Sequence, residues 1–198
     1  MSSDAFGHTW DGQRVTVVGL GRSGLAAVKL LRRAGARVRV TEARDTLPLR
    51  AGLSCLRRLG VEQVELGGHT RACLEGADQL VVSPGVPESA GPIRWAAESR
   101  IPVCSEIDLA FRFCPSPIVA VTGTNGKSTA VTLVAALLNA AGRQAVACGN
   151  LGTPFSSMLR RLTSRTIAVV EVSSFQLLWC DAFRPKVGVL LNIGMNHL

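Results

Sequence analysis

The sequence RVTVVGLGRSG at residues 14–24 joins a run rich in β-branched residues to three closely spaced glycines. Arg14–Val18 is short and mostly apolar, as expected of a buried strand, and the glycines that follow predict a tight turn. From Gly24 to Ala34 apolar residues recur at helical spacing, Gly35 ends the pattern, and Val38–Thr41 is typical of a second strand. Strand, glycine turn, helix and strand form a βαβ unit, which predicts a parallel sheet with right-handed crossovers.

The same alternation continues along the chain. Further helices are predicted at residues 49–59, 93–99 and 128–141, and further strands at 79–82, 101–104, 118–121, 145–148, 167–172 and 187–191. Prolines at 102, 115 and 117 interrupt the pattern before it restarts. We therefore predict an α/β fold: a Rossmann-like parallel-sheet domain at residues 1–104, followed by a truncated P-loop-type α/β ATPase domain at residues 105–198.

The first glycine turn has the spacing of a diphosphate-binding loop. Gly19-Leu20-Gly21-Arg22-Ser23-Gly24 fits G-x-G-x-x-G between a strand and a helix, where backbone N–H groups and the positive helix end can hold a pyrophosphate. Glu42 ends the second strand, where an acidic residue could meet a ribose hydroxyl. The motif alone is compatible with NAD or FAD, with another nucleotide diphosphate, or with a purely structural turn.

A second, more specific loop lies at Thr122–Thr129, with the sequence TGTNGKST. It joins a predicted strand to a predicted helix, so its backbone N–H groups would surround phosphates, with Lys127 reaching the terminal ones and Ser128 offering a hydroxyl to Mg²⁺. The strict Walker pattern fails because its first glycine would fall at Val121. A chance turn is the alternative interpretation.

Composition limits the other function classes. The formal net charge is +8, but the basic residues are spread along the chain and there is no tyrosine, so a nucleic-acid surface is less favoured than solvated helix faces or anionic small substrates. Six cysteines without zinc-site spacing indicate reduced core residues. Neither a secretory signal nor a membrane-spanning stretch is recognisable, and a cytoplasmic monomer is expected.

At this point the motifs resemble a known family. Gly123–Thr129 is similar to the phosphate loop of the Mur ligases and of their folate-polyglutamating relatives. Three further segments resemble the D-glutamate-adding branch of the Mur ligases: Gly19–Gly24 with Ser83-Pro84-Gly85, the turn Gly149–Gly152, and Glu171–Leu177. The resemblance covers essentially the whole chain in order.

This resemblance implies a three-domain, ATP-dependent ligase of peptidoglycan synthesis. In such enzymes one domain binds the UDP substrate, a central domain binds ATP, and a C-terminal domain helps to bind ATP and the amino acid. The γ-phosphate of ATP would move to the carboxylate of UDP-N-acetylmuramoyl-L-alanine, and the amine of D-glutamate would attack the acyl phosphate. The first glycine loop would then hold the UDP diphosphate instead of NAD.

The resemblance also implies roles for particular residues. Catalysis is expected of Lys127, Glu171 and His197, and Mg²⁺ binding of Ser128, Glu171 and His197. ATP binding is expected of Gly123, Thr124, Asn125, Gly126, Lys127, Ser128 and Thr129. Substrate binding is expected of Gly19, Leu20, Gly21, Arg22, Ser23, Gly24, Glu42, Arg44, Ser83, Pro84, Gly85, Asn150, Gln176 and His197. A structural ion pair for Glu171, turn or cap hydrogen bonds for Asn150 and Gln176, and a structural His197 are the alternatives.

Two departures from the family pattern affect these expectations. Asn196 stands where the family commonly has Asp, which removes a negative charge near the metals. The family's metal-binding lysine and its D-glutamate domain would lie beyond Leu198, so this stretch is expected to bind the UDP substrate without completing ligation. An NAD-dependent oxidoreductase and a non-catalytic relative that binds the UDP precursor are the competing interpretations.

Overall fold

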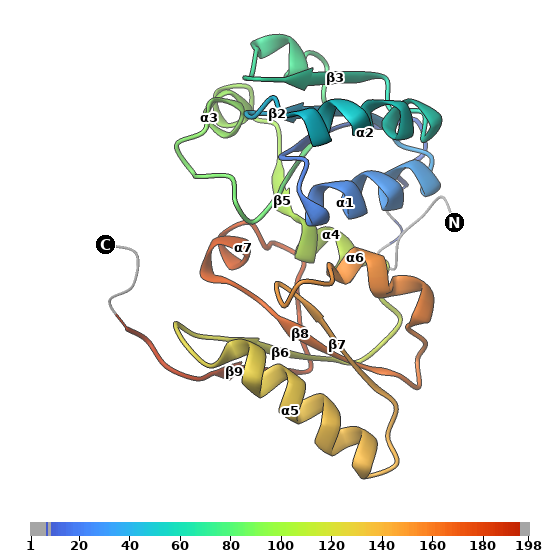
Figure 1. Cartoon of the computed structure of the whole chain (residues 1–198), viewed down its shortest axis with the longest axis vertical. Coiled ribbons are helices and arrows are strands. Elements are labelled where there is room, and N and C mark those ends of the chain that lie inside the picture. The colour runs from blue at the N-terminus through green and yellow to red at the C-terminus, as the bar shows by residue number, and fades with distance from the viewer. Residues whose placement is uncertain (1–6, 8, 195–198) are drawn as a thin grey trace.

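Two parallel β-sheets, each formed by one part of the chain, make up the structure, a computed structural model that describes residue 7 and residues 9–194 (Figure 1). The first sheet has the order β3-β2-β1-β4-β5. Its strands are β1 (Arg14–Val18), β2 (Arg37–Glu42), β3 (Gln63–Leu66), β4 (Gln79–Val82) and β5 (Val103–Ser105). Helices α1 (Arg22–Arg33), α2 (Leu47–Arg58) and α3 (Gly91–Glu98) and the short 3₁₀ helix η1 (Arg71–Leu74) connect these strands.

The second sheet has the order β7-β8-β6-β9. Its strands are β6 (Ile118–Thr122), β7 (Ala145–Gly149), β8 (Ile167–Glu171) and β9 (Val187–Leu190). Helix α5 (Lys127–Ala140) follows β6, α6 (Phe155–Met158) and the 3₁₀ helix η2 (Leu159–Arg161) follow β7, and α7 (Ser174–Leu178) follows β8. Because all pairs are parallel, the carboxyl ends of neighbouring strands meet at one edge of each sheet, where loops can form a site.

The buried residues explain why the strands form where they do. Val15, Val17, Val38 and Val40 alternate into one face of the first sheet, and α1 covers that face with Leu31. Burial of such side chains contributes about 1.5–3 kcal/mol each, which offsets the entropy lost when the strands are ordered.

One predicted strand begins later than expected. The strand predicted at residues 101–104 is observed at 103–105, because Ile101, just beyond α3, caps that helix: its N–H donates to Ala96 O at 2.8 Å. Arg100, with φ of +56°, makes the left-handed turn that this helix ending requires. Strand β3 and helices α4 (Glu106–Arg112), α6 and α7 were not predicted.

Helix α4 connects the two sheets. Asp108, which is fully buried, accepts hydrogen bonds at 2.8 Å from Ala182 N and Phe183 N, just before β9. Strand β5 is held to the end of α7 by a bond of 2.8 Å from Ser105 N to Trp179 O. Backbone and side-chain hydrogen bonds therefore join the sheets, while the division into domains at residue 104 stays a prediction.

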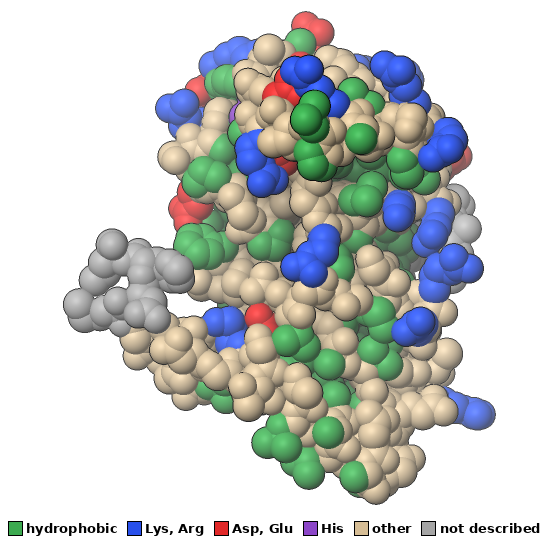
Figure 2. Space-filling view, viewed as in Figure 1, with side chains coloured by type: hydrophobic (Ala, Val, Ile, Leu, Met, Phe, Trp, Pro, Cys, Tyr) green, Lys and Arg blue, Asp and Glu red, His purple; other side chains and the backbone are tan. Residues whose placement is uncertain are grey.

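On the face that Figure 2 shows, most Lys and Arg side chains lie over the first sheet and along the right-hand edge, and few lie over the second sheet. Hydrophobic side chains gather at the lower end over α5, whose Leu133 and Leu137 are exposed. In the part of the chain that is described, no helix has both the length and the apolar character needed to cross a bilayer.

Candidate active site

The phosphate loop predicted at residues 122–129 lies between β6 and α5. Gly126 caps α5 in the left-handed region, with φ of +81°. The N–H groups of the first turn of α5 have no partner within the helix, and they point out of its positive end. The loop therefore lies at the positive end of α5, a setting that is common in anion-binding sites.

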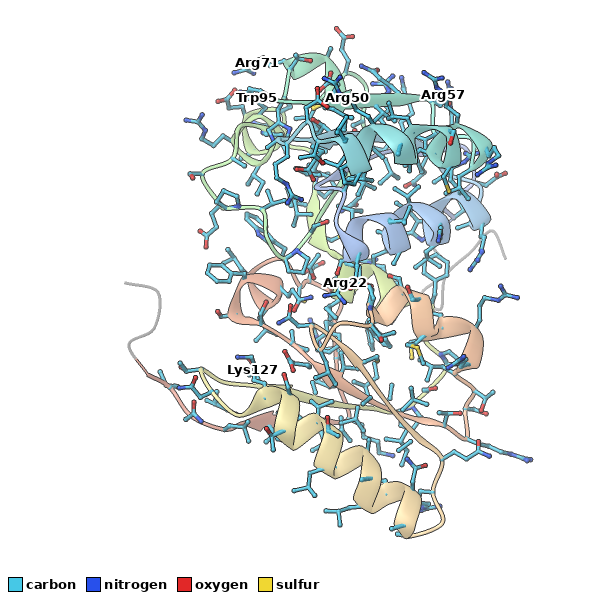
Figure 3. The ribbon with its side chains drawn as sticks, in the orientation of Figure 1. Arg22, Arg50, Arg57, Arg71, Trp95 and Lys127 are labelled. Carbon is cyan, nitrogen blue, oxygen red and sulfur yellow. The ribbon has the colours of Figure 1, made fainter. Side chains whose placement is uncertain are left out.

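Lys127 begins α5 and folds back over this loop (Figure 3). Its Nζ donates to Gly123 O at 2.7 Å and to Thr124 O at 2.9 Å. The ammonium group thus lies against the loop, where its partners are two carbonyl oxygens.

A carboxylate connects the loop to the neighbouring strands. Glu171, at the end of β8, is 3% exposed, and its Oε2 accepts a bond of 2.6 Å from Ser128 Oγ. Its Oε1 accepts a bond of 3.1 Å from Asn150 Nδ2, and its backbone oxygen accepts one of 3.0 Å from Asn150 N. Glu171 is therefore paired with hydroxyl and amide groups here, and these contacts do not include an ion pair.

The donor set at Ser128 and Glu171 fits Mg²⁺. Both offer hard oxygen atoms, and Mg²⁺ typically takes one or two protein oxygens and completes its shell with water and phosphate oxygens. Within residues 7 and 9–194 there is no group of three or more His, Cys, Asp or Glu side chains that could form an all-protein metal cage. His197, the third predicted ligand, lies outside the described residues, as does Asn196.

The first glycine loop is packed more tightly than the second. A side chain at Gly24 would overlap the carbonyl oxygen of Gly19, so α1 can approach the end of β1 only with glycine there. Ser83 Oγ, from the loop after β4, donates to Gly19 O at 2.9 Å. At Gly21 the backbone is extended, with φ of −72°, and a side chain would project into open space.

Glu42 holds this loop from β2. Its Oε2 accepts from Leu20 N at 2.7 Å, and its Oε1 accepts from Arg44 N and Arg44 Nε, both at 3.0 Å. Burial alone would raise the pKa of Glu42, but the hydrogen bonds from Arg44 and from Leu20 N–H outweigh it and lower the pKa. The carboxylate therefore stays charged and serves first to shape the loop.

A pocket of about 760 Å³ collects most of the predicted substrate residues. Ten of them line it: Gly19, Gly21, Arg22, Ser23, Glu42, Arg44, Ser83, Pro84, Gly85 and Asn150. Asn150, Gly152 and Pro154 reach it from the second sheet, and Figure 3 shows Arg22 between the two sheets. The pocket thus runs from the first glycine loop to the residue that contacts Glu171.

Three predicted substrate residues within the described part do not line this pocket. Leu20 packs against the first core and contributes its N–H to Glu42, and Gly24 is covered by the loop itself. Gln176 is 1% exposed; its Oε1 accepts from Ser173 N at 2.9 Å and forms a capping box at the start of α7. The cap interpretation accounts for the Gln176 oxygen, while its Nε2 has no hydrogen-bond partner among the described atoms.

Sequence reasoning missed other residues that line the pocket. His69 also lines the pocket, and its Nδ1 is 2.6 Å from Thr41 Oγ1. Val86, Pro87 and Ala90 add an apolar wall. Only the position of His69 just after β3 could have indicated it, and that strand was itself not predicted.

Comparisons with known proteins match both parts of the chain. Residues 13–105 match the family described as Mur ligase MurD-like, N-terminal domain, and residues 121–198 match the Mur ligase middle domain. A UDP-N-acetylmuramoylalanine--D-glutamate ligase of Desulfosudis oleivorans is 47% identical over 188 residues, which are 95% of this chain and 41% of that protein. The protein of the same name from Pelotomaculum thermopropionicum is 45% identical over 186 residues, 94% of this chain and 41% of that protein. The chain spans about two fifths of the length of these relatives.

Solved structures support the fold. A UDP-N-acetylmuramate:L-alanyl-gamma-D-glutamyl-meso-diaminopimelate ligase from Neisseria meningitides superposes with a TM-score of 0.56 at 20% identity, over 94% of this chain and 62% of that one. A UDP-N-acetylmuramate-alanine ligase from Thermotoga maritima gives a TM-score of 0.52 at 22% identity, over 93% of this chain and 42% of that one. At these identities the likeness concerns the fold, and it confirms the predicted α/β class.

Proposed function

This chain belongs to the Mur ligase family, and from that premise we propose that it forms the substrate- and ATP-binding parts of a ligase that adds D-glutamate to UDP-N-acetylmuramoyl-L-alanine. The names of its curated relatives support the choice of substrates. The observation that carries the proposal is the bonded series from Asn150 in the pocket, through Glu171, to Ser128 in the phosphate loop. It joins a site for a nucleotide-linked substrate to a site for a nucleoside triphosphate.

In this proposal the UDP diphosphate lies against the first glycine loop and the N-terminal end of α1. Gly21 leaves open space for it, and Arg22 provides a cation at the same edge. Glu42 and Arg44 lie at the uridine end. The sugar and the alanine then extend toward Asn150, which brings the free carboxylate to the side of the pocket nearest the phosphate loop.

The reaction that follows has two steps. The carboxylate oxygen of the alanine attacks the γ-phosphorus of ATP, which forms an acyl phosphate and releases ADP. The amine of D-glutamate then attacks the acyl carbon, the C–O bond to phosphate breaks, and the amine loses a proton as the amide forms. Phosphoryl transfer depends mainly on positioning and charge neutralisation.

Three side chains serve those needs: one is a cation, and two could bind a metal ion. Lys127, once displaced from Gly123 O and Thr124 O, is a fixed cation for the β- and γ-phosphate oxygens. Ser128 and Glu171 would hold Mg²⁺, which supplies further neutralisation of the phosphate charge when bound.

The test is a calorimetric titration of this chain with UDP-N-acetylmuramoyl-L-alanine, with NAD in a parallel cell. Wild-type chain is expected to bind the UDP compound in a saturable manner. Gly21→Leu fills the open space beside the loop without backbone strain, because residue 21 is extended, and it should abolish that binding. Circular dichroism would verify that each variant is folded.

Gly52→Leu is the matched control. A side chain at Gly52, within α2, also meets nothing within 4 Å, and Gly52 does not line the pocket. This variant should bind like the wild type. Binding of NAD in place of the UDP compound, or equal binding by the Gly21 and Gly52 variants, would contradict the proposal.

A further inference from the structure

The segment that follows β9 is bonded to the phosphate loop, and Asn192 makes three of these bonds. Asn125 N donates to Asn192 Oδ1 at 2.9 Å, and Asn192 Nδ2 donates to Asn125 O at 3.1 Å. The backbone adds a bond of 3.1 Å from Thr124 N to Asn192 O. We propose that Asn192 is a positioning residue for the phosphate loop, an inference that rests on the proposed ATP site and assigns part of its geometry to the segment after β9.

The same region contains further contacts that hold the loop at this place. Gly194 N donates to Thr124 Oγ1 at 2.8 Å. A side chain at Gly123 would come within 3.1 Å of Asn192 O and 3.2 Å of Leu191 Cβ, so this position needs glycine for the two segments to meet. The close approach at Gly123 and the paired hydrogen bonds between Asn192 and Asn125 are two independent signs that these segments are fitted to each other.

These bonds decide which loop groups are free for phosphate. The N–H groups of Thr124 and Asn125 are committed to Asn192. Backbone donors that these bonds leave open include those of the first turn of α5, which begins at Lys127. Asn192 therefore turns the loop so that the phosphates meet the end of α5, where the helix dipole adds to the hydrogen bonds.

An amide side chain suits this role because it offers a donor and an acceptor together. Asn192 uses both on one peptide unit of the chain, Oδ1 for the N–H and Nδ2 for the C=O of Asn125. Alanine would supply neither group. Aspartate would keep an acceptor for the N–H but would turn a second acceptor toward the carbonyl oxygen.

Asn139, near the end of α5, provides a matched control. Its Oδ1 accepts from Ala145 N at 3.0 Å, and its Nδ2 donates to Ala145 O at 2.9 Å, so it makes the same kind of amide pair. It lies near the far end of α5 and contacts neither glycine loop. Loss of either amide pair removes similar hydrogen bonds, but only Asn192 is expected to affect nucleotide binding.

The experiment compares the wild-type chain with Asn192→Ala and Asn139→Ala. MgATP affinity is measured by calorimetry, and exchange of the Thr124 and Asn125 amides by NMR. Asn192→Ala should weaken MgATP binding by about fivefold to thirtyfold, which corresponds to one or two net hydrogen bonds, and should speed exchange of the Asn125 amide, whose acceptor it removes, more than exchange of the Thr124 amide, whose backbone acceptor remains. Asn139→Ala should leave both unchanged, and both variants should bind the UDP substrate normally.

The following results would overturn the positioning role of Asn192 or the proposed ATP site. MgATP affinity unchanged in Asn192→Ala, or lowered equally in Asn139→Ala, overturns the inference. If wild-type chain binds no MgATP, the proposed ATP site fails, and the exchange of the Asn125 amide still tests the positioning role by itself. If Asn192→Ala does not fold, Asn192→Asp takes its place, and unchanged MgATP affinity in that variant also overturns the inference.

Discussion

At the scale of single residues, Glu106 shows how burial changes a group outside the proposed site. It begins α4, is 1% exposed, and its Oε1 accepts a bond of 2.6 Å from Ser156 N. Its Oε2 has no hydrogen-bond partner among the described atoms. Burial raises the pKa of Glu106, and hydrogen bonding from Ser156 offsets only part of that rise.

The sign of the pH effect follows from this raised pKa. Between the unfolded pKa, about 4.3, and the higher folded pKa, the native chain binds more protons, so stability falls as pH rises. Glu106→Gln removes the ionisation and keeps an acceptor for Ser156 N. We expect this variant to gain stability relative to the wild type as pH increases from about 4 to 8, measured by urea unfolding. A constant difference across that range would show that Glu106 does not titrate as inferred.

Residue-scale prediction from sequence succeeded where one motif fixes a local geometry. The strand-loop-helix setting of Lys127 was predicted, but its bonds to Gly123 O and Thr124 O were not, because they depend on the loop's exact path. The partner of Asn125 could not be predicted either. Asn192 is 67 residues away in the sequence, and only the pairing of β9 with β6 brings it near.

At the scale of elements, alanine substitutions at one glycine in α1 and one in α2 are expected to change the stability of the chain in opposite directions. Gly24→Ala should destabilise the chain by about 1–3 kcal/mol, because the new methyl group overlaps Gly19 O and pushes α1 from β1. Gly52→Ala should stabilise it by about 0.5–1 kcal/mol, since the site is open and alanine favours the helix. Chemical denaturation measures the free energy of unfolding of each variant. Changes of the same sign in the two variants would contradict the packing argument.

The elements that sequence reasoning missed are short. Strand β3 (Gln63–Leu66) alternates polar and apolar residues over only four positions and has no continuous apolar run, and α7, with five residues, is too short to show a helical period. Helices α4 and α7 did carry a local signal, because Ser105 and Ser173 each accept a hydrogen bond from the backbone N–H three residues later. By contrast, the apolar runs of β1 and β6 are long enough, and bounded by glycine loops, for prediction to place them well.

At the scale of the whole molecule, the pocket draws its lining from both sheets. A ligand that fills it should therefore stabilise both parts of the chain. At a concentration of 100 times Kd, UDP-N-acetylmuramoyl-L-alanine should add about 2.7 kcal/mol and raise Tm by about 5–10 °C for a chain of this size. Differential scanning calorimetry measures the shift.

Hydrogen exchange of the backbone amides would locate the residues that the ligand stabilises. Amides at residues 19–24 and at 149–152 should both be protected by the full substrate, since both segments line the pocket. UDP alone, which lacks the sugar and the alanine, should protect the first segment and leave the second unchanged. Protection of residues 19–24 alone by the full substrate would mean that it does not reach Asn150.

The folded-back position of Lys127 has a consequence for discrimination among anions. A hydrogen bond to a charged group is worth about 1.5–3 kcal/mol, and the ammonium makes two with loop carbonyls. A chloride or a single inorganic phosphate offers few contacts in exchange and gains little by displacing it. A triphosphate chain can replace both bonds and also engage the first turn of α5. In the proposed ATP site, Lys127 would therefore favour the binding of polyphosphates over that of chloride or inorganic phosphate.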